Sequence, residues 1–291
     1  MQDIFGRIIA VNQQVYLGTG RLWGINSLDI SPSFGLQPLN YIGINNKQVN
    51  QIVNSEQFID VTINGNLIDS DQFIQYTGSD CFNIFILQNQ GNLDNNYSLI
   101  SGYLNSYSLK FSVGQPVQTT VGIKFVRDCG KIPTGIMNSN AYNELIQIPT
   151  GIYENVERKF HVPSFGSTNL ILNEYNNQRI TDANIGYKIS RTPIYNIGNK
   201  SPSKINIIYP IVINCSFTME INELYSGIEL KQISSNIQTQ DITFNVFEND
   251  NSSNLIASYG FSGMSAINER RGVTVDGNTT ITKEFEGYIF N

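Results

Sequence analysis

Alternation of apolar and polar residues is the dominant pattern along this chain. From 213 to 221 every odd position is apolar and every even position is polar, and the run 107–113 alternates in the same way. A period of two places one face of a β-strand in the core and the other in water. Both runs are therefore predicted to be strands of antiparallel sheets with one solvated face.

Shorter apolar runs predict four further strands, at 58–63, 121–126, 242–247 and 280–285. Turn residues separate the predicted strands, among them Asn45-Asn46, Asn64-Gly65 and Asp276-Gly277. Helical spacing occurs only at 67–76 and 220–234, where Gly227 weakens the pattern. We expect a mainly β protein with one short helix in each half.

Short motifs recur in the same order in the two halves. The run PLNYIG at 38–43 returns 155 residues later as PIYNIG at 193–198. The strand ending at Ile63 matches the one ending at Ile221, a shift of 158, and the apolar run from Phe82 matches the run from Ile242, a shift of 160. Collinear matches with a slowly drifting offset indicate a duplicated domain with loop insertions.

Residues 128–163 fall between the two halves and carry the sequence IPTGI twice, at 132–136 and 148–152. Proline and glycine at these spacings suit an extended connector. A stretch of this length is uncommon inside a domain. We therefore predict a first β domain over 1–127, a connector over 128–163 and a second β domain over 164–291.

The charge of the chain argues against nucleic-acid binding. The 291-residue chain carries a net charge of −6 and only 14% charged residues, so Asn, Gln, Ser and Thr supply most of its polar surface. A surface of this kind suits permanent contact with neighbours, or reflects the codon bias of an AT-rich genome. No basic stripe is present to bind phosphates. An acidic balance is compatible with a wall past which DNA slides.

Catalytic chemistry has little support in the sequence. His161 is the only histidine, and Cys81, Cys129 and Cys215 form no CxxC pair, so we predict no catalytic site, metal site or cofactor, and no enzyme. The glycines of 18–24 are spaced G-x-G-x-x-x-G and are predicted to form a turn before a strand rather than a dinucleotide loop. Neither a signal peptide nor a membrane segment is predicted.

Residues 191–198 read R-x-P-x-Y-x-x-G, between a strand and a loop that leads into the alternating run at 213. This arrangement resembles the tail tube proteins of long-tailed bacteriophages, and 107–125 is similar to a later hairpin of that fold. The first half departs from the pattern, because Gln37 replaces Thr192 and no arginine precedes Pro38.

The resemblance implies two tandem β-sandwich or barrel domains, each with one flanking helix, in a structural virion protein. Six such domains complete a ring, so three chains would form a homotrimer with pseudo-six-fold symmetry. Stacked rings would form a tail tube through which DNA passes without specific binding. Partners would be the chain itself, a tape-measure protein and other tail proteins. The protein would be assembled in the bacterial host cytoplasm and located in the virion.

The resemblance also implies that the loops at 32–52 and 191–209 contact the next ring. The alternative is that each is an ordinary hairpin loop that packs on its own domain. The residues concerned are Pro38, Tyr41, Gly43, Arg191, Pro193, Tyr195, Gly198, Lys200 and Pro202. Polar strand faces are candidates to line the channel, namely Ser108, Lys110 and Ser112, and Asn214, Ser216 and Thr218.

Two other readings remain. One is a neck, distal-tail or baseplate component of a phage. The other is a carbohydrate-binding or adhesin module with two β-sandwiches, which would need an aromatic cluster repeated in both halves. Trp23 shifted by 155 falls on Gln178 and has no aromatic counterpart.

Overall fold

The computed structural model describes residues 13–33, 36–38, 52–54, 58–76, 78, 80–88, 96–126, 129–131, 162–163, 166, 168–172, 179–197, 202–220, 239–248, 254–272 and 279–290. Their regular structure is almost entirely β, as the alternation predicts. In chain order the elements are β1 (Gln13–Leu17), β2 (Gly20–Leu22), β3 (Ile25–Ser33), β4 (Leu36–Pro38), β5 (Ile52–Asn54), β6 (Phe58–Asn66), the 3-10 turn η2 (Ile74–Tyr76), β7 (Phe82–Gln88), β8 (Tyr97–Ser112), β9 (Gln118–Phe125), β10 (Cys129–Lys131), β11 (Thr168–Leu172), β12 (Arg179–Ile194), β13 (Lys204–Glu220), β14 (Thr239–Phe247), β15 (Leu255–Gly272) and β16 (Thr280–Ile289).

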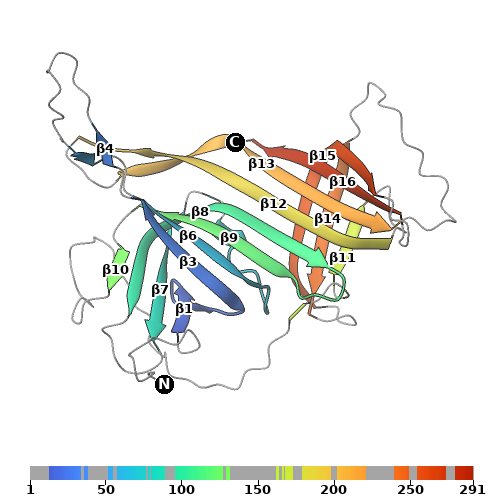
Figure 1. The fold of residues 1–291 in the computed structure, drawn as a ribbon, viewed down its shortest axis with the longest axis horizontal. Coiled ribbons are helices and arrows are strands. Elements are labelled where there is room, and N and C mark those ends of the chain that lie inside the picture. Colours follow the sequence, from blue (N-terminus) through green and yellow to red (C-terminus); the bar gives the residue numbers. More distant parts are fainter. Residues whose placement is uncertain are drawn as a thin grey trace, which may run out of the picture.

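One open antiparallel sheet of 14 strands contains every described strand except the small pair β4–β5. Its centre is a strip of strands in the order β3-β6-β9-β8-β12-β13-β16-β15 (Figure 1). We call these strands the strip. The hairpin β12–β13 is its longest pair, and the pairing of β12 with β8 links the two halves of the chain.

Strand pairing repeats along the chain. In the first set of strands, β1 pairs with β7, β7 with β8, β8 with β9, β9 with β6 and β6 with β3. In the second set the same order runs β11, β14, β15, β16, β13 and β12. Every pair is antiparallel. The contact of β8 with β12 joins the two sets into one sheet.

Irregularities in the ladders repeat at matching places. Where β7 meets β8 the register shifts, and Ser101 has a φ of 57° while its backbone N–H donates to the Asn83 Oδ1 at 3.0 Å. Where β14 meets β15, Gly263 has a φ of 67° and its N–H donates to the Asp241 Oδ1 at 2.9 Å. In both sets, a β-bulge is therefore stabilised by a side-chain oxygen that accepts from the N–H of a residue with positive φ.

These bulges fix which residues correspond between the sets. The pairing gives offsets of 155 from β3 to β12, 154 from β6 to β13, 158 from β7 to β14 and 162 from β8 and β9 to β15 and β16. The offset of 155 between β3 and β12 equals that of the sequence match beginning at Pro38 and Pro193, of which residues 39–43 and 198 lie outside the described part. The matches that place Ile63 with Ile221 and Phe82 with Ile242 are out of register by four and two residues, because short apolar runs look alike at several offsets.

A continuous apolar core runs between the sets. Phe111 of β8 stacks on Phe244 of β14 with ring centroids 5.4 Å apart, and Phe217 stacks on Phe285 at 5.3 Å within the second set. All four rings are almost completely buried. Each contributes about 1.5–3 kcal/mol relative to an exposed ring, so the two sets stabilise one another.

The expected helix at 67–76 is absent. Asp69 has a φ of 57°, Ile68 bridges Ser70, and the Asp71 side chain accepts from the Phe73 N–H at 2.9 Å before the short 3-10 turn. Aspartate side chains that bond nearby backbone favour turns over helices. The second expected helix, 220–234, begins in β13 and otherwise lies outside the described residues.

Turn predictions succeed and fail in different places. Gly18, with a φ of 59°, and Thr19 form the turn between β1 and β2, as predicted for the glycine-rich segment. Asn64-Gly65 is not a turn, because it continues β6 in register with β9. Asn45-Asn46 and Asp276-Gly277 lie outside the described residues. Of the predicted connector, residues 129–131 form β10, which pairs with β8.

Candidate functional site: the polar face of the strip and the junction of the strand sets

One face of the strip is polar across its whole width. Strand register places Lys110, Asn184, Ser216, Glu284 and Asn268 in one row, on the face opposite the buried residues of the same strands. The predicted channel-lining residues of β8 and of β13 thus lie on the same face. A single continuous surface results, rather than two separate patches.

Charges of both signs are dispersed over this face. They belong to Asp29, Asp60, Lys110, Lys124, Asp182, Lys188, Arg270, Glu284 and Glu286. Asn, Ser and Thr fill most positions between them, and hydrogen bonds cross from strand to strand. The Thr120 hydroxyl donates to the Asn64 Oδ1 at 2.9 Å, and Thr218 and Thr282 hydroxyls lie 2.9 Å apart at the corresponding place in the second set. Such a face attracts neither polycations nor polyanions strongly.

Arg191 fastens the junction between the sets. It lies on β12, yet its Nε donates to the Leu104 carbonyl at 3.0 Å and its Nη2 to the Gly78 carbonyl at 2.7 Å, both in the first set. The Tyr103 ring lies 5.4 Å from its guanidinium. Burial lowers the pKa of Arg191 from its ordinary value, with Tyr103 and Tyr209 opposing this. Arg191 therefore connects the two strand sets within one chain, and we call it the arginine latch.

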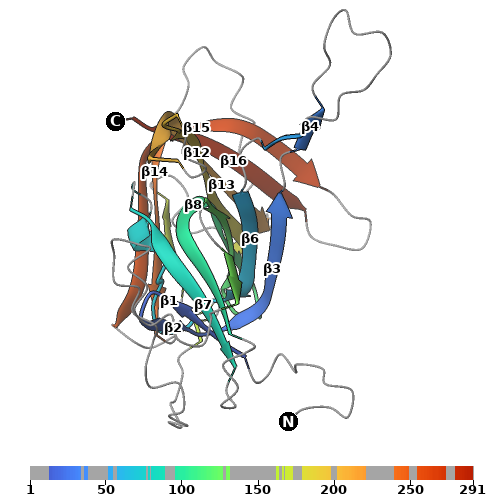
Figure 2. The same cartoon turned by 90° about the vertical axis from the view of Figure 1, so that its left-hand side faces the viewer.

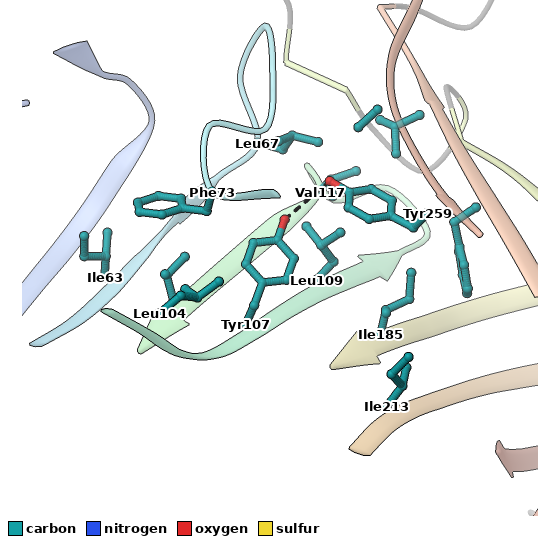
Figure 3. Close-up of a cluster of buried hydrophobic side chains, with 14 of the residues drawn as sticks. Ile63, Leu67, Phe73, Leu104, Tyr107, Leu109, Val117, Ile185, Ile213 and Tyr259 are labelled. Atoms are coloured by element: carbon teal, nitrogen blue, oxygen red, sulfur yellow. Dashed lines mark hydrogen bonds between the residues drawn. The ribbon is translucent and has the colours of Figure 1, made fainter. Parts of the chain in front are cut away.

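A second polar contact crosses the junction inside the core. The Tyr259 hydroxyl of β15 donates to the Asp71 Oδ2 at 2.6 Å, and the Tyr107 hydroxyl of β8 donates to the same oxygen. The two hydroxyls lie 3.3 Å apart and point toward one another (Figure 3). Tyr187 of β12 stacks on Tyr107 with centroids 5.3 Å apart. One first-set carboxylate thus holds tyrosines of both sets.

Burial dominates the titration of this cluster. It raises the pKa of Tyr107, Tyr187 and Tyr259 above the ordinary tyrosine value, and the neighbouring Asp71 carboxylate raises each further. The phenol protons are therefore held firmly, and these tyrosines serve as hydrogen-bond donors. Nothing in the cluster is arranged to transfer a proton at neutral pH.

Only some of the predicted loop residues lie in a loop. Arg191 and Pro193 belong to β12, and 204–209 to β13, so the expected loop at 191–209 is wrong for its ends. Tyr195 follows β12 and is half-buried, Pro202 is buried before β13, and Pro38 ends β4. Tyr41, Gly43, Gly198 and Lys200 lie outside the described residues. The alternation of 204–208 is interrupted by paired Ile207 and Ile208, which hid the strand.

The sequence analysis did not single out Asp71 or Tyr259, and it treated Tyr107 only as an apolar residue of an alternating strand. Their chain positions are far apart, and each sits in an ordinary pattern: an acidic turn or an alternating strand. No group of His, Cys, Asp and Glu suited to a metal ion occurs among the described residues. Cys81 is exposed and Cys215 is buried, and neither forms a disulfide.

These features define a mainly β protein built on one open antiparallel sheet. No known protein family model matches the chain, and no curated protein matches it significantly. Within the described part of the chain, no helix has the length and apolarity required to cross a bilayer.

Proposed function

We propose that this protein is a structural virion component whose copies join edge to edge into rings, and that stacked rings form the tail tube of a long-tailed bacteriophage. The repeated strand pairing carries the proposal. Two sets with the same order are joined head to tail by β8 and β12, and in a repeating ring this pairing would be one of the contacts between equivalent units. Closed rings leave no sheet edge unpaired.

The polar face supports a channel. Its dispersed charges and its Asn, Ser and Thr side chains would let a polyanion pass without binding. Three chains would bring 24 strip strands into a ring, with a circumference of about 115 Å and a backbone diameter of about 37 Å at ~4.8 Å per strand. Such a channel is wider than duplex DNA. In this proposal each strand set is one of six equivalent tube domains, and no catalysis is involved.

Negative-stain electron microscopy of the purified protein over a range of concentrations tests the function. Hollow tubes, or rings of three chains with six lobes, are expected. Mass photometry of the same samples should show a species of three chains. A monodisperse monomer at every concentration contradicts the proposal and favours a low-copy neck or baseplate component.

A further inference from the structure

The junction of β8 with β12 has unpaired counterparts at the two ends of the strip. By register, β3 is the first-set equivalent of β12, and residues 268–272 of β15 are the second-set equivalent of residues 106–110 of β8. Among the described residues no strand pairs with β3 on the edge away from β6, its neighbour in Figure 2, and none pairs with 268–272 on the edge away from β16.

We infer that a second copy of this chain pairs the free edge of its β3 with residues 268–272 of β15, in the register of the internal junction. This deepens the assembly proposed above and rests on it. The direction of the strands agrees, because neighbours in the strip alternate and β15 lies antiparallel to β3 across the missing contact. The partner is the chain itself, since each edge already has its complement within the same molecule.

Applying the register of the internal β8–β12 junction to the contact between copies gives definite residue pairs. Gly186 lies opposite Ser108 inside the chain, which places Ser31 opposite Arg270 of the second copy. Ile185 lies opposite Leu109, which places Ile30 opposite Arg271. The pair Asn184 and Lys110 places Asp29 opposite Gly272, one diagonal step from Arg270 on the polar face.

At the β3 edge, the Ile30 side chain is suited to a covered position. Ile30 is 39% exposed, whereas its counterpart Ile185 is 1% exposed beneath the junction. A second copy would cover Ile30 and bring Asp29 near Arg270, a cross-strand pair of opposite charge. The polar face would then continue without interruption from one copy to the next.

The contact between copies lacks the fastenings of the internal junction. Leu36 stands where β12 has Arg191, Pro32 where it has Tyr187, and Glu269 where β8 has Tyr107. The arginine latch and the tyrosine stack are thus confined to the chain, and Pro32 cannot donate a ladder hydrogen bond. We therefore expect a contact weaker than the internal one, formed only as copies accumulate.

Disulfide trapping tests the register. Two proteins are made in a background of Cys81→Ser and Cys129→Ser, one with Ser31→Cys and the other with Arg270→Cys. Residues opposite each other in antiparallel strands lie about 4.5–5.5 Å apart, within disulfide range. After mixing and mild oxidation, covalent dimers are expected on non-reducing gels at least about tenfold above either protein alone.

Two controls accompany the mixture. Ser31→Cys mixed with Arg271→Cys should give at most background dimer, because a one-residue slip places the two thiols on opposite faces. Ser108→Cys with Gly186→Cys in one chain should close an internal disulfide, since a Cβ at Gly186 would lie 3.6 Å from the Ser108 Cβ.

Microscopy of the same samples separates the possible failures. Rings or tubes without the dimer overturn the inferred contact and leave the assembly function standing. Absence of both dimer and assemblies, with the internal disulfide formed, overturns both. Dimer at equal yield with Arg270→Cys and Arg271→Cys overturns the register.

Discussion

The two strand sets share one pairing order, but the first set buries both faces of its β7 strand and the second set buries only one face of the equivalent β14. In β7 of the first set, Ile84, Phe85, Ile86 and Leu87 are all buried, whereas β14 of the second set alternates between buried and partly exposed residues. Register puts Thr243 where the first set has Phe85. The side chains that both sets bury therefore accompany the shared strand order. Burial of the opposite face differs between the sets.

Packing at one cross-strand position shows how the sets diverge without changing register. Gly102 lies opposite Phe125 in the first set, and a Cβ on Gly102 would lie 2.4 Å from that ring. At the corresponding position the second set has Met264 beside Gly287, where a Cβ would lie 2.3 Å from the methionine sulfur. The large and small residues have exchanged strands and the local volume is conserved.

The largest expected effect is loss of stability in alkali. Tyr107, Tyr187 and Tyr259 have raised pKa values in the fold, so above pH ~10 the unfolded chain releases protons that the folded chain retains. The contribution of the three tyrosines to stability is complete below that pH and falls above it, by about 1.4 kcal/mol per pH unit for each tyrosine. Burial also raises the pKa of Cys215 to about 12, which starts the decline near pH 8.5.

Urea unfolding at pH 7, 9, 10 and 11 measures this decline. Tyr259→Phe should reduce the slope above pH 10 by about one quarter, because it removes one of the four linked protons of Tyr107, Tyr187, Tyr259 and Cys215. Cys215→Ala should flatten the part between pH 8.5 and 10. Identical slopes in the wild type and Tyr259→Phe would show that the junction cluster does not govern alkaline stability.

The next largest effect on stability is expected when the Gly102–Phe125 pair of the first set is replaced by the Met–Gly arrangement of the second set. Phe125→Gly alone should cost about 3–5 kcal/mol by leaving a cavity, and Gly102→Met alone about 1–3 kcal/mol by overpacking. Together they reproduce the second-set arrangement in the first set, so the double variant should be more stable than the sum predicts, with a coupling of about 1–3 kcal/mol. Urea unfolding of the three variants gives the coupling.

Met264→Gly with Gly287→Phe is the reciprocal control in the second set. Coupling of the same sign in both sets supports conserved volume as the reason for the exchange. Additive effects in both would show that the two positions relax independently, despite the close contacts.

Arg191→Leu removes the latch and gives β12 the residue that β4 has at the equivalent place. Loss of two hydrogen bonds from a charged group should lower the free energy of unfolding by about 2–3 kcal/mol. Arg191→Lys should recover only part of this, because an ammonium cannot reach two separate carbonyls with the geometry of a guanidinium. Chemical denaturation checks both variants. Arg179→Leu is the control, because the Arg179 side chain is 77% exposed in its ion pair with Glu220 and its expected loss is below about 1 kcal/mol.

Local pattern predicted the strands well, because strip strands bury one face and wet the other. Ile213 to Met219 alternates in the structure as it does in the sequence. Contacts made at long range were not predictable in this way. Tyr259 contacts Asp71 and Tyr107 across the two sets, and nothing local marks Arg191 as an internal latch rather than a loop residue. The repeat was visible, but its register required the bulges at Ser101 and Gly263.

The smallest expected effect concerns those two bulges, where the sets solve the same backbone problem with different residues. Gly263→Ser places a side chain at positive φ with no atom within 4 Å of its Cβ, so only the backbone conformation changes in energy. We expect a loss of about 1 kcal/mol. Ser101→Gly should give a gain of similar size or less, because it relieves the left-handed backbone while Asn83 still accepts from the same N–H. Gly260→Ser on the same strand, whose φ is not positive, is the matched control for added bulk. Thermal unfolding separates the three, and equal losses for Gly263→Ser and Gly260→Ser would mean that the bulge residue of the second set carries no backbone strain.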